Sequence, residues 1–379
     1  MASLNTIVTW VLVAVMCSIV IKIMLMLDTN KKAYGHIPGP CRYVEGINRG
    51  ARDIELILPD GIALITSGGR LVNNSETAKF KGRVYVYEWP DVKEGVKKGP
   101  NVKEDVPKAI KVNIVPGEDG ELDLNTFNPQ GISAYVSKGR INVYIVNHAP
   151  DGDAVESFLY DKKKRTLYHS KSIRSDAIYA ASDLVAVGPD KFYVTNSHYF
   201  KSWWLQLMEI YLLLNLGNIV YYDGKATVVD KWLSMPTGMA SDKFRKHLYV
   251  SNALQEFVRL YNISGDQSLV KHVDMSMMST PEHVFVDPES NELWVGTHPV
   301  MHEYLKHIPA PKTTFASSQV IHIKLQGEMD RWVLAETFAD DGRLLNASSV
   351  VIRHQNQLLI GSMFNKLLLC DLMHEDFQN

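Results

Sequence analysis

Short apolar runs alternate with polar or small turn residues along most of the chain, after one long apolar run near its start. Five of the short runs end in small or polar residues: Asn142–His148, Lys191–Asn196, His247–Asn252, Glu292–Gly296 and Gln357–Gly361. They recur at roughly 45 to 65 residues, an irregular spacing that suits propeller blades with loop insertions better than a strict solenoid. We therefore favour a β-propeller over a generic β-sandwich, with the strand near the axis carrying its polar end to a central channel.

The long apolar run spans Ile7–Leu27 and carries one charge, Lys22. A helix needs about 20 residues to cross the hydrocarbon core, and a lysine near its end can extend to the headgroups. A cleaved signal peptide fits less well, because a basic start and a small-residue cleavage site are missing and the run is too long. We predict a transmembrane helix at 7–27, a short cytoplasmic stub at 1–6, a linker at 28–40 and an ectodomain at 41–379.

The three cysteines divide between the apolar run, which holds Cys17, and the two ends of the ectodomain, which hold Cys41 and Cys370. This placement suggests a disulfide, although two unpaired buried thiols fit the sequence as well. Glycosylation sequons begin at Asn73, Asn262 and Asn346. Sequons and cysteines together favour an oxidising compartment of the secretory pathway.

The orientation signals disagree. Lys22, Lys31 and Lys32 follow the apolar run, and the positive-inside rule would place them in the cytoplasm. The sequons and the cysteine pair argue instead that the body is lumenal or extracellular, because a disulfide would be reduced in the cytoplasm. We expect a single-pass protein of the endoplasmic reticulum, the plasma membrane or both, with a lumenal or extracellular propeller.

Composition excludes one class of partner. Hydrophobic residues make up 46% and charged residues 22% of the chain, the balance of a folded protein, and the formal net charge is −2. This charge provides no basic footprint, so nucleic acid is not an expected partner.

The segment Trp203–Leu216 breaks the strand pattern, with helical length and a single charge at Glu209. It can lie as a helix on the membrane or on a partner. Alternatively it caps the propeller, with its other face shielded by loops.

A family resemblance rests on motifs in matching order: residues 41–47, 58–63, 66–68, 127–133, 146–148, 183–189, 192–200, 286–289, 293–299 and 369–372. Over about residues 40 to 372 the chain resembles the paraoxonases. The resemblance implies a six-bladed propeller with two calcium ions in its channel, one structural and one catalytic. It also implies a first-to-last disulfide matching Cys41 and Cys370, and an uncleaved hydrophobic N-terminus.

The two calcium sites differ in how well this chain matches the family. The structural ligands fall on Asp53, Asp183 and the backbone carbonyl of Ile132, an oxygen set that suits Ca²⁺. The catalytic ligands, one glutamate, one aspartate and three asparagines in the family, fall here on Arg52, Ser182, Thr237, Glu282 and His283. A guanidinium at this position repels a cation and needs a partner, so we expect Arg52 to pair with Glu282. The resemblance then implies one structural calcium.

The proposed general base is also incomplete. Of the family's histidine pair, the outer member matches His148, whereas the inner one is Gln130, an amide that cannot take up a proton near neutral pH. His198 and His298 match other family histidines. A zinc site of Glu282, His283 and His298 is disfavoured, because neighbours on a strand point to opposite faces.

Two functions follow from the resemblance. An intact scaffold with an altered catalytic site suggests a pseudoenzyme. It resembles the membrane-anchored nematode members that serve as chaperones or accessory subunits of degenerin-type, epithelial-type sodium channels in touch mechanosensation. The alternative is a calcium-dependent arylesterase or lactonase that uses His148.

Overall fold

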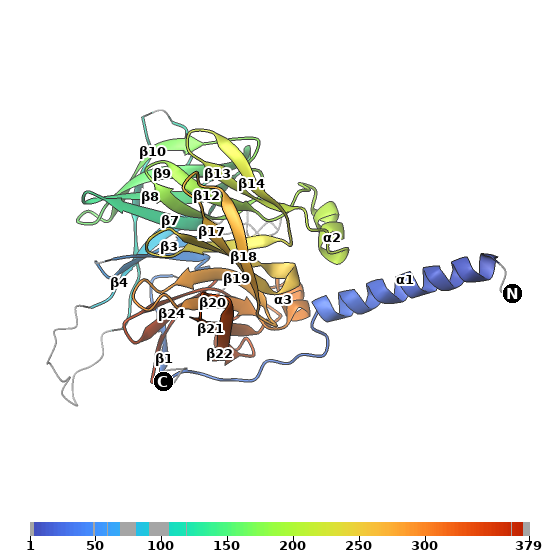
Figure 1. The fold of residues 1–379 in the computed structure, drawn as a ribbon. Helices are drawn as coiled ribbons and strands as arrows, with labels where there is room; N and C mark the ends of the chain where they lie inside the picture. The colour runs from blue at the N-terminus through green and yellow to red at the C-terminus, as the bar shows by residue number, and fades with distance from the viewer. Residues whose placement is uncertain are drawn as a thin grey trace.

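A computed structural model describes residues 4–47, 50–58, 60–68, 81–90, 106–118, 120–364 and 366–373. It contains six antiparallel sheets of four strands each, one of them extended by a fifth strand that pairs in parallel. The sheets are arranged around a common axis, and one long helix projects from the body (Figure 1). The predicted six-bladed propeller with one N-terminal apolar helix is confirmed.

Three sheets come from the first half of the chain. Their strands are β2 (Asp53–Ile57), β3 (Ile62–Ser67), β4 (Arg83–Glu88) and β5 (Ile110–Lys111); β6 (Asn113–Val115), β7 (Pro129–Ser137), β8 (Arg140–Ala149), β9 (Gly152–Asp161) and β10 (Thr166–Ile173); and β11 (Ala181–Gly188), β12 (Lys191–Asn196), β13 (Gly217–Tyr222) and β14 (Ala226–Leu233). In each sheet the earliest antiparallel strand is innermost. β2 lies against β7, and β7 lies against β11.

The second half repeats this order. Its strands are β15 (Pro236–Ser241), β16 (His247–Asn252), β17 (Phe257–Ile263) and β18 (Leu269–Ser276); β19 (Thr280–Val286), β20 (Leu293–His298), β21 (Ser318–Gln326) and β22 (Arg331–Asp340); and β23 (Ser348–His354), β24 (Gln357–Ser362) and β25 (Leu367–Asp371) with β1 (Cys41–Val44). Contacts of β11 with β15, β15 with β19, β19 with β23 and β23 with β2 complete the ring of inner strands.

The recurring sequence phrase occupies the second strand of each sheet, namely β8, β12, β16, β20 and β24, rather than the strand nearest the axis. The expectation that it lines the channel is therefore wrong. The polar ends of these second strands bond to neighbouring blades. The Thr195 hydroxyl of β12 donates to the Thr237 carbonyl (2.7 Å), and the Thr66 hydroxyl of β3, the second strand of the first sheet, donates to the Gln130 carbonyl (2.5 Å). The sixth copy, β3, differs enough in sequence to have been missed.

Apolar side chains fill the interfaces between blades. Leu64 of β3, for example, packs in one cluster with Val143 and Ile145 of β8, all three without solvent exposure. Such close packing fixes the position of each sheet relative to its neighbours. The inner strands are therefore held in fixed positions around the channel.

Chain ends meet in the last sheet. β1 pairs antiparallel with β25, and Cys41 lies opposite Cys370 with their Cα atoms 4.1 Å apart and their sulfurs bonded. This confirms the predicted first-to-last disulfide. A bridge that closes a loop of 329 residues lowers the entropy of the unfolded chain, which stabilises the fold by about 6 kcal/mol in the chain-entropy account.

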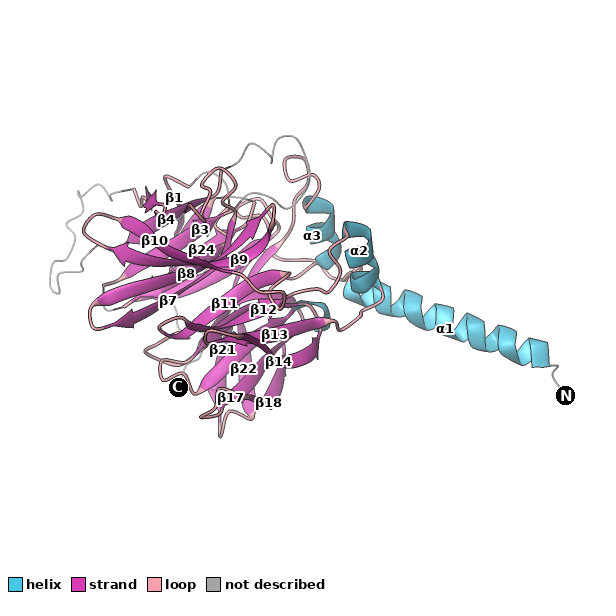
Figure 2. Cartoon of the chain, turned by 90° about the horizontal axis from the view of Figure 1, so that it is seen from above, coloured by secondary structure: helices cyan, strands magenta, loops and turns pink. Residues whose placement is uncertain are grey.

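The long helix α1 (Leu4–Met26) projects away from the propeller, as Figures 1 and 2 both show. It is exposed throughout its most apolar stretch and, by length and composition, can cross a membrane. The observed helix begins three residues before the predicted span and ends one residue earlier.

Below α1 the chain is attached to the propeller. Asp28, whose side chain has no solvent exposure, accepts a hydrogen bond from the Met301 amide (3.1 Å). Lys31 Nζ lies 2.6 Å from Asp28 and 3.1 Å from Glu256, and the Leu27 carbonyl accepts the His302 amide (3.0 Å). We call this set of contacts the anchor junction. It means that the start of the predicted linker is docked rather than a free tether.

Two short helices stand on the face from which α1 projects (Figure 2). α3 (Met301–His307) belongs to the anchor junction, as does η2 (Ala253–Gln255) through the neighbouring Glu256. α2 (Trp203–Tyr211) is shorter than the predicted helical segment and buries Glu209, which accepts the amides of Tyr199 and Phe200.

Candidate metal centre in the central channel

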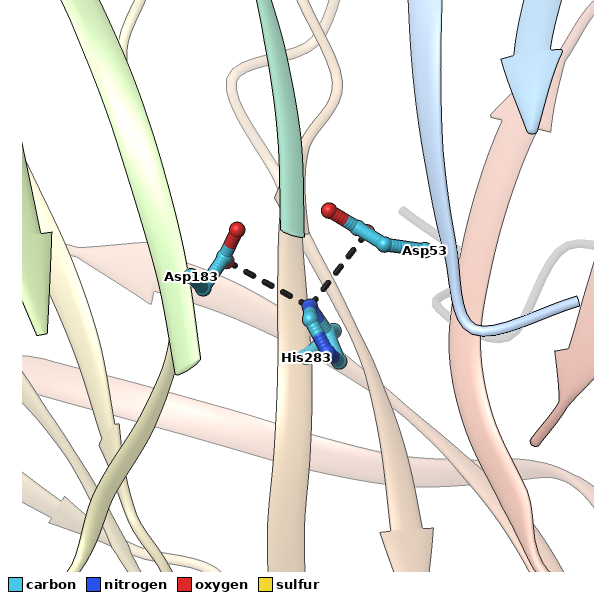
Figure 3. A group of neighbouring side chains, drawn as sticks. All are labelled: Asp53, Asp183 and His283. Carbon is cyan, nitrogen blue, oxygen red and sulfur yellow. Dashed lines mark ion pairs between the residues drawn. The ribbon is translucent and has the colours of Figure 1, made fainter. Parts of the chain in front are cut away.

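Three inner strands bring together the charged residues that the sequence analysis singled out. Asp53 begins β2, Asp183 lies in β11 and His283 lies in β19. In Figure 3 the three side chains point toward one another from separate strands. His283 Nδ1 lies 3.3 Å from Asp53 Oδ1 and 3.3 Å from Asp183 Oδ2. We call these three residues the acid–histidine cluster.

Backbone amides orient both carboxylates. Asp53 accepts from the amides of Ile54 and Ile132, both at 2.8 Å. Asp183 accepts from those of Leu184 and Met239, both at 2.7 Å. Each of the four oxygens therefore has one donor from a β-strand, which fixes the direction of its remaining lone pair.

Electrostatics in the cluster are strongly coupled. Burial raises the pKa of Asp53 to about 7, although the nearby His283 opposes this shift. Burial lowers the pKa of His283, but the carboxylates of Asp53 and Asp183 outweigh burial and raise it to about 9. The cluster thus concentrates negative charge at a place where a positive charge is favoured.

The cluster fits a divalent cation. One ligand atom from each residue lies within 4.8 Å of the others, and all three residues are buried. Two carboxylates match the oxygen ligands expected from the resemblance. The sequence analysis did not place His283 here, because it assigned this residue by family position to the other site.

Asp53 and Asp183 also line a cavity of 260 Å³ inside the ring of inner strands. Glu55 lines the same cavity and accepts the Ala134 amide (2.7 Å), and burial raises the pKa of its carboxyl to about 8. A cation can therefore approach the cluster through a polar space.

The positions that match the family's catalytic calcium ligands have a different arrangement. Glu282 Oε2 lies 3.8 Å from His298 Nε2, and both side chains are buried. The Arg52 guanidinium contacts Met363 Sδ (3.7 Å). Tyr304 donates to the same sulfur (3.6 Å) and stacks on His298. We call this group the arginine cluster.

Arg52 does not pair with Glu282 as expected: within the described residues its side-chain contact is Met363. Its charge still acts on the carboxylate. Burial raises the pKa of Glu282, but His298, His283 and Arg52 together lower it below its usual value. The expected pair is therefore replaced by a looser group in which histidine is the nearer neighbour.

The other two positions supply hydroxyls. Thr237 donates to the Glu282 carbonyl (2.8 Å), so its oxygen is engaged with the backbone of the next blade. Ser182 is partly exposed beside Asp183. An arginine, which has no acceptor oxygen, and a threonine hydroxyl that donates to the backbone are not typical calcium ligands.

The two positions of the family's histidine pair are engaged separately. His148 Nε2 lies 2.6 Å from the Ala181 carbonyl, so this nitrogen carries the proton, and burial lowers the pKa of the ring. The Gln130 amide donates to Asn128 at 3.3 and 3.2 Å. His198 bonds Ser197 (2.9 Å) and Gln206 of α2 (2.8 Å).

Of the predicted sequons, Asn262 lies in β17 and Asn346 lies in the loop before β23, and both are partly exposed. Asn73 lies outside the described residues. Glycosylation of these asparagines stays a prediction.

The sequence profile of the arylesterase family matches residues 22–372. This chain belongs to the arylesterase family.

Relatives of this arylesterase-family chain include two kinds of protein. It is 30% identical to Mechanosensory abnormality protein 6 of Caenorhabditis elegans over 375 residues, 98% of this chain and 96% of that protein. It is 30% identical to serum paraoxonase/arylesterase 2 of Gallus gallus and 29% identical to serum paraoxonase/arylesterase 1 of Homo sapiens, with 88% of each chain covered in both pairs. This chain is thus similar both to arylesterases and to a protein named for mechanosensation.

Among solved structures, the luciferin-regenerating enzyme has a similar fold, with a TM-score of 0.51 and 10% sequence identity over 90% of this chain and 98% of that one. At this identity the likeness supports the propeller fold alone.

Proposed function

We propose that this arylesterase-family chain is a non-catalytic, membrane-anchored propeller that helps degenerin-type, epithelial-type sodium-channel subunits to assemble, reach the cell surface and function. The observation that carries the proposal is the arginine cluster. Arg52 places a fixed positive charge where the family binds the ion that polarises a carbonyl. The similarity to a mechanosensory protein supports the choice of partner.

The family's chemistry needs an ion at a site that can also reach substrate. Here Arg52 and Glu282 sum to zero charge without a metal, so a second cation gains little from entering. Gln130 cannot replace the missing base. We therefore propose a single divalent cation per chain, at Asp53 and Asp183, with calcium the ion that the resemblance implies and Ile132 a further carbonyl ligand. When bound, it would join three blades.

Membrane attachment follows the predicted domain bounds: a stub at 1–6, a transmembrane helix within 7–27, a segment at 28–40 and the propeller at 41–379. The anchor junction supports this arrangement because it fixes the propeller to the end of α1. The propeller would then be lumenal or extracellular, in the endoplasmic reticulum, the plasma membrane or both.

α2 would lie at the same membrane surface. Trp203 is 71% exposed and Trp204 is 53% exposed, so loops do not cover this helix. Tyr211 and Leu212 share a cavity of 560 Å³ with Ile19 of α1, which puts α2 beside the base of the anchor. Tryptophans favour the level of the lipid headgroups, so α2 supports the reading of a second membrane contact.

The test is co-expression of this chain with a degenerin-type channel subunit, with surface biotinylation of the channel and current recording. We expect the full chain to raise both signals. Arg52→Glu, which restores one ligand type, should leave channel support unaltered or reduce it. Channel surface levels that are unchanged by removing the chain would refute the proposal.

The alternative, a calcium-dependent arylesterase or lactonase, is favoured by family membership and by the retained His148. It predicts turnover of phenyl acetate or a δ-lactone that requires calcium and disappears in His148→Ala. Turnover that survives this substitution, or no turnover, would exclude this mechanism.

A further inference from the structure

His283 is the residue of the acid–histidine cluster that an all-oxygen calcium site would not use. Its side chain is 4% exposed, and within the described part of the chain Nδ1 has no hydrogen-bond partner. Nδ1 faces one carboxylate oxygen of Asp53 and one of Asp183, so a positive charge is favoured between the three atoms.

The distances fit a small cation. Nδ1 lies 3.3 Å from Asp53 Oδ1 and 3.3 Å from Asp183 Oδ2. Ligands about 2.0–2.2 Å from a tetrahedral Zn²⁺ are separated from one another by about 3.3 Å. A cation near Nδ1 can therefore contact both carboxylates, since the ligand atoms of the three residues lie within 4.8 Å of one another.

The nitrogen decides which cation is favoured. Calcium takes oxygen ligands, whereas an imidazole nitrogen together with carboxylates is typical of zinc and similar divalent metals. Two aspartates and one histidine also supply three protein ligands, which leaves a position for water.

The surroundings meet two further requirements of a metal site. The four backbone amides that bond Asp53 and Asp183 hold the first ligands in place, as outer-shell partners do. The 260 Å³ cavity, bordered by Glu55 as well as by both aspartates, provides an approach for the ion.

We propose that Asp53, Asp183 and His283 form a mixed nitrogen–oxygen site that binds Zn²⁺ in preference to Ca²⁺ and joins the blades of β2, β11 and β19. The inference rests on the single-cation part of the proposed function and assigns zinc, in place of the calcium that the resemblance implies, as that ion. It does not depend on whether the chain supports a channel.

The experiment uses the full chain, purified in detergent and stripped of metal with a chelator. It is dialysed against micromolar Zn²⁺ with calcium in excess, and bound metal is measured by elemental analysis. We expect about one zinc per chain and little calcium, together with a higher thermal unfolding midpoint in Zn²⁺ than in Ca²⁺. More calcium than zinc, or neither metal, would overturn the proposal.

His283→Asn replaces the nitrogen ligand by an amide oxygen. We expect zinc affinity to fall by at least about 10–100-fold and calcium to become the preferred ion. His298→Asn is the matched control, because it removes another buried channel histidine outside the cluster. Unchanged zinc affinity in His283→Asn would contradict the assignment.

Should His283→Asn fail to fold, Co²⁺ bound to the unaltered chain provides the decision. Visible absorption typical of tetrahedral cobalt, lost on adding one equivalent of Zn²⁺, is the expected result. Its absence would overturn the proposal. Since these readouts use purified protein and no channel, a failure here is distinguishable from a failure of channel support.

Discussion

The acid–histidine cluster and the arginine cluster are built from the same inner strands, often from adjacent residues. Asp53 and His283 belong to the first cluster, and their neighbours Arg52 and Glu282 to the second. Arg52 directly precedes β2, and Glu282 and His283 lie where the register of β19 shifts between Pro281 and Val284, so one stretch of backbone can supply both clusters. The first cluster is rich in backbone donors and negative charge, whereas the second balances its own charges. One channel can therefore place a cluster that fits a cation beside a cluster whose own charges balance.

Removing a carboxylate should have the largest effect on the free energy of unfolding. The loss should be larger in the acid–histidine cluster than in the arginine cluster. Asp183→Asn leaves one backbone amide facing an NH₂ group and removes a partner of His283. We expect a loss of about 3–5 kcal/mol in unfolding free energy, measured by thermal or urea unfolding. Glu282→Gln, which loses no backbone donor in the described residues, should cost less than about 2 kcal/mol. Equal losses would show that backbone donors do not make the acid–histidine cluster more important for stability than the arginine cluster.

A second prediction concerns restoring the family's charge. Arg52→Glu sets a carboxylate near Glu282 without the remaining ligands, so like charges should destabilise the fold by about 1–3 kcal/mol. We expect no phenyl acetate hydrolysis with added calcium, because Ser182 and Thr237 still cannot complete the site. Arg52→Gln serves as the control that removes the positive charge alone. Calcium-dependent turnover by Arg52→Glu would show that this single residue distinguishes the arginine cluster from the family's catalytic calcium site.

A third prediction is that His198 makes the stability of the fold depend on pH. Burial lowers the pKa of His198 to about 4, and its ring accepts a hydrogen bond from Gln206 that requires the neutral form. Between pH 6.5 and 4 the unfolded chain takes up a proton that the folded chain does not. Stability should therefore fall over this range, by about 1–3 kcal/mol, and level off below it.

The readout for His198 is the difference in unfolding midpoint between pH 7 and pH 5. In His198→Gln this difference should be smaller than in the unaltered chain. An identical pH dependence in the two proteins would mean that the pKa of His198 does not differ between the folded and unfolded states, and that other groups cause the effect.

The smallest effect is expected outside the channel, at the anchor junction. Lys31 is partly exposed, so its ion pairs with Asp28 and Glu256 should contribute only about 0.2–1 kcal/mol. Lys31→Gln should nevertheless speed hydrogen exchange at the Met301 amide, which Asp28 accepts. Lys32→Gln, a change at the exposed neighbour, is the control and should leave this exchange rate unaltered.

Much of the fold could be predicted because its signals are local. An apolar run of membrane length, strands that recur with turns between them, and two cysteines at the ends of the ectodomain are visible residue by residue. The family motifs then indicated six blades and the aspartates Asp53 and Asp183. The repeat was assigned to the wrong strand, because apolar pattern alone does not distinguish first from second strands that are both buried.

Sequence order makes Glu282 and His283 neighbours in one stretch of backbone, but alternation does not set their directions, because the register of β19 shifts between Pro281 and Val284. The direction of each side chain is set by the tertiary structure. The position of β19 in the ring turns His283 toward the aspartates of β2 and β11 and leaves Glu282 with His298. The same holds for Arg52, whose sulfur partner comes from the far end of the chain. The charge and type of each residue follow from the sequence at that position, but the partner of a buried charge depends on how the blades close into a ring.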